Sequence, residues 1–153
     1  MSISTKRRTL LKGTMGAGTI GLAAAAGLLT PQAVLAAWNE KAFTAKSVDG
    51  AIGGAASHSD KIKIKAPDIA ENGSVVPVTI TSSIGGTETI SILADKNSTP
   101  LAAEFVLGTG AESTVSTRIK MGKTGAVVGV VKAGGKLYAN RKEVKVTIGG
   151  CGG

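Results

Sequence analysis

The chain of 153 residues contains a single cysteine, third from the end of the sequence VKVTIGGCGG. Cys151 has two glycines on each side, Gly149 and Gly150 before it and Gly152 and Gly153 after it. Glycine gives the backbone its widest conformational freedom and its narrowest cross-section. The thiolate is the reactive form of a cysteine, and a thiol with the ordinary pKa of about 8.5 is partly ionised at neutral pH. The segment therefore predicts a flexible arm that brings one reactive sulfur into a narrow cleft of another protein.

The other side chains that could do chemistry are isolated. His58 is the only histidine, and a zinc site needs three or four ligands, so we interpret it as a solvated loop residue. Lys61, Lys63 and Lys65 alternate with isoleucines and could attract anions, but lysines in this pattern also protect an edge strand from aggregation. No Ser-His-Asp set and no phosphate-binding loop can be singled out. We expect no metal site, no cofactor and no catalytic residue.

The first 36 residues have the layout of a bacterial export signal. A basic segment that contains Arg7 and Arg8 precedes an apolar run of Gly, Ala and Leu, and small residues suited to cleavage follow at Ala36 or Ala37. Consecutive arginines fit the twin-arginine type of signal, whose cargo crosses the membrane already folded. A retained anchoring helix is the alternative, but the run is rich in glycine and only mildly apolar. We expect cleavage, a periplasmic location and no stable membrane anchor.

Removal of this leader halves the net charge of the protein. The leader carries four of the 18 basic side chains and none of the 10 acidic ones, so the formal charge falls from +8 to +4. Residues 37–153 retain two arginines and four aromatic residues, too few for a typical nucleic-acid surface. A mild positive field could still attract small anions or acidic proteins. With one cysteine, no internal disulfide forms.

After the leader, the pattern predicts a short helix followed by strands. Trp38, Ala42, Ala45, Val48 and Ile52 form one helical stripe, which two glycines should end. ASHSD is then expected to be a loop and PDIAENG a turn, and a proline in the second strand suggests an edge or a bulge. Six or seven short strands are expected, within residues 61–65, 74–82, 85–95, 101–108, 113–121, 125–134 and 136–148.

These elements predict an all-β fold, an immunoglobulin-like antiparallel β-sandwich with a short N-terminal helix and a flexible glycine-rich C-terminal arm. A small β-barrel is the alternative. Because aromatic residues are scarce, the core must consist of Val, Ile, Leu and Ala. Three regions are expected: an export signal at 1–36, a β-sandwich domain at 37–148 and the arm at 149–153.

The chain resembles the SoxY family, the sulfur-carrying subunits of the bacterial thiosulfate-oxidising (Sox) system. The resemblance rests on the terminal TIGGCGG, the twin-arginine leader and three stretches at 61–80, 101–121 and 135–153. The segment KNSTP at 96–100 departs from the family, in which a more proline-rich loop is expected. The resemblance implies that Cys151 is the covalent attachment site for sulfur and that the four glycines around it form a swinging arm.

The resemblance also implies a carrier without catalysis of its own, whose only bound groups are sulfur intermediates on the cysteine. A SoxZ-like subunit would form a heterodimer with it. A c-type cytochrome would couple thiosulfate oxidatively to the cysteine, and a hydrolase would then release sulfate. In some organisms a sulfur dehydrogenase would oxidise the remaining sulfur.

Two other interpretations of the residues remain open. The carboxylate of Gly153 could carry sulfur as a thiocarboxylate, as in ubiquitin-like carriers, although the adenylation that this needs takes place in the cytoplasm. The chain could also be an exported structural or adhesive β-sandwich module in which Cys151 is incidental.

Overall fold

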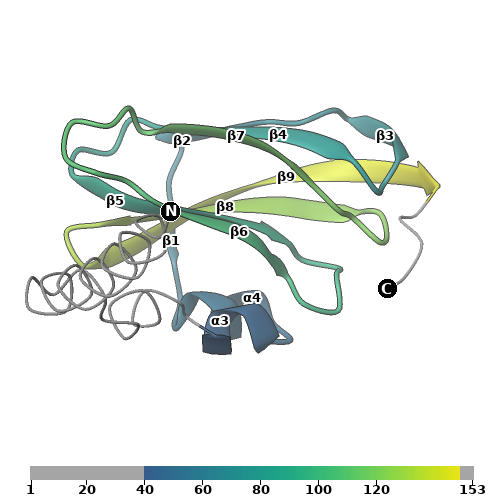
Figure 1. The fold of residues 1–153 in the computed structure, drawn as a ribbon, viewed down its shortest axis with the longest axis horizontal. Coiled ribbons are helices and arrows are strands. Elements are labelled where there is room, and N and C mark those ends of the chain that lie inside the picture. Colours follow the sequence, from purple (N-terminus) through teal and green to yellow (C-terminus); the bar gives the residue numbers. More distant parts are fainter. Residues whose placement is uncertain (1–39, 149–153) are drawn as a thin grey trace, which may run out of the picture. The chain divides into compact units, whose positions relative to one another are not determined.

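A computed structural model describes residues 40–148 of the chain. Cys151, the four glycines around it, Arg7 and Arg8 lie outside the described residues, as do both expected cleavage positions. The described residues form two short helices and nine strands (Figure 1). The strands make two sheets, and the helices lie against the outer side of the larger sheet.

The predicted helix is broken into two, α3 (Glu40–Thr44) and α4 (Val48–Ile52). Ser47 causes the break because its backbone is extended and its side chain accepts a hydrogen bond from the N–H of Gly50 at 3.1 Å. A serine in this position caps the N-terminus of a new helix. The single continuous helix was therefore a wrong prediction. Its predicted end is confirmed, since Gly53 caps α4 in a left-handed conformation.

The larger sheet has the strand order β1-β9-β8-β5-β6, and β3 also pairs with β9. The pairs β9–β8, β8–β5 and β5–β6 are antiparallel. The β8–β9 hairpin turns at Gly134 and Gly135, whose φ angles of 55° and 73° suit the two-residue turn preferred in hairpins. The strand bounds are β1 Ser57–His58, β3 Ile69–Asn72, β5 Thr87–Ala94, β6 Leu101–Val106, β8 Gly125–Ala133 and β9 Lys136–Ile148.

The smaller sheet has the order β2-β4-β7, with bounds Ile62–Lys65, Val76–Ser82 and Thr114–Ile119. Pro77 lies in β4, the middle strand, where a missing N–H would normally break a ladder. It is tolerated because β2 pairs only with residues 79–82 of β4, which leaves Pro77 with β7 as its single neighbour. At Pro77 itself, β4 therefore has one free edge, as predicted.

Two segments expected to be a loop and a turn are strands. β1 comes from ASHSD and β3 from PDIAENG, and both pair with β9 in parallel. The sandwich is therefore antiparallel except along one edge of β9. Strands of two and four residues are too short to give a periodic pattern, and their partner lies far along the chain.

The core has two parts, one on each side of the larger sheet. Between the sheets, aliphatic side chains such as Ile62, Ile80 and Val127 are fully buried. Between the larger sheet and the helices, Leu93 and Val128 pack with the alanines of α3 and α4. Because β8 is buried on both faces, its sequence is a nearly continuous apolar run rather than an alternating one. Because the strands form two separate sheets, the predicted β-sandwich is confirmed and the barrel alternative is wrong.

Candidate functional site

The predicted site residue Cys151 lies three positions beyond Ile148, the last residue of β9. The described part of the site is therefore the end of β9, from which the predicted arm continues. Contacts on both edges hold this strand up to its last described residues. None of these contacts was predicted from the sequence.

The short strand β3 holds one edge of the end of β9. Its residue Asn72 pairs with Ile148, the last residue of the strand. The N–H of Gly73 donates to the carbonyl of Ile148 at 2.8 Å, and the hydroxyl of Thr147 donates to the carbonyl of Glu71 at 3.0 Å. The backbone of β9 is thus hydrogen-bonded up to its final residue.

The segment that leads into β3 is itself fixed to β9. The ammonium of Lys142 donates to the carbonyl of Ala66 at 2.6 Å and lies 3.0 Å from a carboxylate oxygen of Asp68. The carbonyl of Asp68 accepts a hydrogen bond from the N–H of Lys145 at 2.9 Å. One partly buried lysine in the middle of β9 therefore positions the strand that holds its end.

On the other edge, β8 pairs with β9 only as far as Val144. Thr124, the residue before β8, continues the contact: its hydroxyl accepts from the N–H of Val146 at 2.9 Å and lies 3.4 Å from the carbonyl of the same residue. A side chain thus replaces the missing strand beside Val146. No local signal in the sequence could reveal this pair, because it joins residues 22 positions apart.

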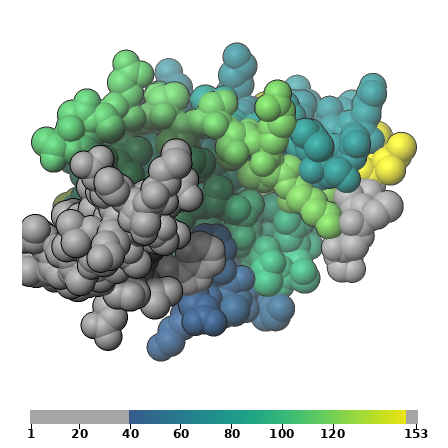
Figure 2. Space-filling model, in the orientation of Figure 1, coloured from purple at the N-terminus to yellow at the C-terminus, as the bar shows by residue number. Residues whose placement is uncertain are grey.

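The end of β9 exposes a large apolar side chain. Ile148 is 69% exposed although it follows the buried Val144 and half-buried Val146 on the same face of the strand. Ile69, the first residue of β3, and Val75, the residue before β4, are also more than half exposed. In the space-filling view the end of β9 reaches the surface beside the segment that holds β3 (Figure 2).

The other predicted candidates lie apart from this end. His58 is exposed in β1, and its Nε2 is 3.0 Å from the carboxylate of Asp60. Lys63 and Lys65 are exposed on β2, which is an edge strand of the smaller sheet. This position fits the interpretation that they protect an edge.

Among residues 40–148, no group of His, Cys, Asp and Glu side chains is arranged to hold a metal ion. Over the same residues, no helix is long and apolar enough to cross a membrane.

Comparison with known proteins covers most of the chain. A search of curated proteins gave no match. Among solved structures, the chain is similar to the sulfur carrier protein SoxY from Chlorobium limicola f thiosulfatophilum, with 47% identity and a TM-score of 0.60. That match covers 72% of this chain and 100% of the other. The family model for the sulfur oxidation protein SoxY matches residues 48–151, a range that includes the cysteine. The chain therefore belongs to the SoxY family of sulfur oxidation proteins.

Proposed function

We propose that this protein carries sulfur intermediates covalently on the thiol of Cys151 and presents them to partner enzymes. The observation that supports this most directly is the extent of the family match, which runs to the only cysteine of the chain. The solved relative is named as a sulfur carrier. The structural or adhesive module gives no account of either finding.

The proposed chemistry begins with the thiolate. Loss of two electrons joins it to thiosulfate, so that Cys–S⁻ and S₂O₃²⁻ become Cys–S–S–SO₃⁻, and a c-type cytochrome takes up the electrons. Water then cleaves the terminal sulfur–sulfur bond and releases sulfate and two protons, leaving Cys–S–S⁻. A hydrolase performs that step, and a sulfur dehydrogenase can oxidise the remaining sulfur. In this scheme the chain is the carrier, and the partner enzymes perform the catalysis.

The proposed arm consists of Gly149, Gly150, Gly152 and Gly153 with the cysteine between them. Two glycines between Ile148 and the cysteine give a reach of about 10 Å when extended. Since the end of β9 is hydrogen-bonded on both edges, movement would begin after Ile148. A fixed base and a thin arm suit a substrate that must enter several active sites in turn.

The proposal includes a location and a partner subunit. Export through the twin-arginine signal at residues 1–36, with Arg7 and Arg8, would place the domain of residues 37–148 in the periplasm. A SoxZ-like subunit would form a heterodimer with it. The exposed Ile148, Ile69 and Val75 offer apolar area that such a subunit would remove from water.

The decisive experiment is the intact mass of the protein purified without reductant from cells grown on thiosulfate. We expect additions of sulfane and thiosulfonate groups that dithiothreitol removes and that are absent from the Cys151→Ser variant. A mass that is unchanged apart from loss of the leader, or that reports only a disulfide-linked dimer, would refute the carrier function.

A further inference from the structure

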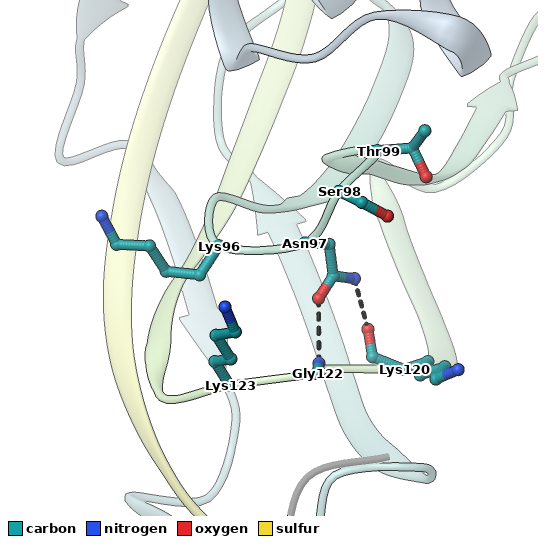
Figure 3. A pocket seen from close by; sticks show the side chains of 7 residues that line it. All are labelled: Lys96, Asn97, Ser98, Thr99, Lys120, Gly122 and Lys123. Carbon is teal, nitrogen blue, oxygen red and sulfur yellow. Dashed lines mark hydrogen bonds between the residues drawn. The ribbon is translucent and has the colours of Figure 1, made fainter. Parts of the chain in front are cut away.

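A second feature lies at the same end of the sandwich as the end of β9. Two loops, residues 95–100 between β5 and β6 and residues 120–124 between β7 and β8, enclose a surface hollow of about 520 Å³ (Figure 3). The hollow is lined by Lys96, Asn97, Ser98, Thr99, Lys120, Gly122 and Lys123. We refer to it as the lysine hollow.

The two loops of the lysine hollow are fixed to each other. The side-chain amide of Asn97 donates to the carbonyl of Lys120 at 2.8 Å, and its oxygen accepts from the N–H of Gly122 at 2.9 Å. Figure 3 shows these two bonds spanning the gap between the loops. The hollow therefore exists before any ligand enters, which lowers the entropy cost of binding.

The first loop is also packed closely on the start of β8. A Cβ atom at Gly125 would lie 2.5 Å from both the carboxylate of Asp95 and the side chain of Lys96. The same carboxylate accepts a hydrogen bond from the N–H of Ala126 at 2.7 Å. Asp95 is thus directed toward β8, and it is not among the residues that line the hollow.

The chemistry of the lining favours a small anion. Three lysines and two hydroxyl groups surround the hollow, and none of its lining residues is acidic. In Figure 3 the side chains of Lys96 and Lys120 extend outward on opposite sides of Asn97, while Lys123 rises toward the loop that carries Lys96. Ammonium and hydroxyl groups are donors that oxyanions accept. Several flexible cations around one preformed hollow suit a group with several oxygen atoms.

The lysine hollow is joined to the end of β9 through the residue that follows Lys123. Thr124, whose hydroxyl bonds the backbone of Val146, follows Lys123 in the chain. In Figure 1 the β5–β6 and β7–β8 connections and the end of β9 lie at one end of the sandwich. A chain of three residues beyond Ile148 can span about 10 Å.

The geometry points to the lysine hollow as a binding site for a sulfur oxyanion, the –SO₃⁻ group of thiosulfate or of a sulfonate-bearing adduct on Cys151. Binding of the adduct in the hollow rests on the proposed carrier function, whereas binding of free thiosulfate does not. A negatively charged adduct held against the body of the carrier would be less accessible to wrong partners. After removal of the –SO₃⁻ group as sulfate, the hollow would lose its ligand, and the arm would be released.

The test uses the exported chain together with any subunit that purifies with it, in buffer of low ionic strength. Sodium thiosulfate is titrated into the Cys151→Ser variant, and NMR signals are followed for the Gly122 amide and the Asn97 side chain. We expect both signals to shift with thiosulfate and sulfate but not with chloride. The double variant Lys96→Gln/Lys123→Gln should bind about tenfold more weakly, which corresponds to about 1.4 kcal/mol for two cations near one anion.

A matched control removes the same charge at the opposite end of the strands. Lys132 and Lys136 flank the β8–β9 turn and are exposed, so Lys132→Gln/Lys136→Gln should leave thiosulfate affinity unchanged. Equal weakening in both double variants would show a general charge effect and overturn the proposal. Absence of any shift with free or attached oxyanion would overturn it as well.

A second arm of the experiment separates the two sources of the oxyanion. Tetrathionate loads the unaltered cysteine, because the thiolate displaces thiosulfate from it and leaves Cys–S–S–SO₃⁻. Shifts of Gly122 and Asn97 in the loaded, desalted protein would assign the hollow to the arm-borne group. Shifts with free thiosulfate only would assign it to free oxyanions. If cells yield no adduct on Cys151, the carrier function fails while the titration of the serine variant still tests the hollow.

Discussion

The hydroxyl of Thr124 accepts a hydrogen bond from the N–H of Val146 at 2.9 Å, two residues after the last pairing between β8 and β9. On the opposite edge, the N–H of Gly73 donates to the carbonyl of Ile148. The last residues of β9 are thus held by the side chain of Thr124 and by the short parallel strand β3, beyond the point where β8 stops pairing. The proposal that the arm moves only after Ile148 depends on these two contacts.

The Thr124→Val variant tests the side-chain contact. It keeps the shape of the side chain but leaves the N–H of Val146 without this partner, at a cost of about 1 kcal/mol. We expect the amide of Val146 to exchange with deuterium about fivefold faster, and the amide of Val144 to be unaffected. Thr114→Val is the control, because it removes the hydrogen bond between the hydroxyls of Thr114 and Thr81 on the smaller sheet. Unchanged exchange at Val146 would show that Thr124 does not hold the strand.

The Asn97→Ala variant tests whether one side chain fixes the lysine hollow. It removes the bonds to the Lys120 carbonyl and the Gly122 N–H, and we expect a loss of about 1–2 kcal/mol in the free energy of unfolding. Urea denaturation measures this loss. Ser98→Ala, at the exposed neighbouring position, should change stability by less than about 0.5 kcal/mol. Equal effects of the two substitutions would contradict the role assigned to Asn97.

The Gly129→Ala variant tests the close approach of the two sheets. A Cβ atom at this position would lie 2.7 Å from Cδ1 of Ile80 and 3.4 Å from Cδ1 of Ile64. Because both isoleucines pack in the core between the sheets, we expect a destabilisation of about 1–3 kcal/mol. Gly108→Ala, where no atom lies within 4 Å, is the control in the same thermal unfolding experiment. If Gly129→Ala left the thermal stability unchanged, the side chains of the core would have to move aside for the added methyl group at little cost.

The Gly150→Val variant tests the proposed arm without touching the sulfur. A β-branched residue stiffens and widens the backbone beside the cysteine, so we expect enzyme-dependent release of sulfate to slow by roughly tenfold or more. The melting temperature and the rate of loading by tetrathionate should remain those of the unaltered protein. Transfer at the normal rate would show that neither a thin nor a flexible arm is needed.

Much of the fold could be predicted from the sequence because its signals are local. The alternation of Lys and Ile at 61–65 predicts an edge strand with one buried face, and β2 is such a strand. The glycine pair in KAGGK predicts the hairpin turn at Gly134 and Gly135. The scarcity of aromatic residues predicts an aliphatic core, which the structure has. The serine at position 47 is also a local signal for a helix N-terminus, but one continuous helix was predicted there.

By itself the sequence determined the strand pattern, the family resemblance and the single cysteine after the last strand, because each is written in neighbouring residues. Only the tertiary structure decided that β1 and β3 pair with β9, that Thr124 reaches Val146, and that Asn97 joins two loops around three lysines. These contacts join residues 22 to 81 positions apart. Their partners are set by how two sheets fold together, and no propensity or spacing along the chain encodes that arrangement.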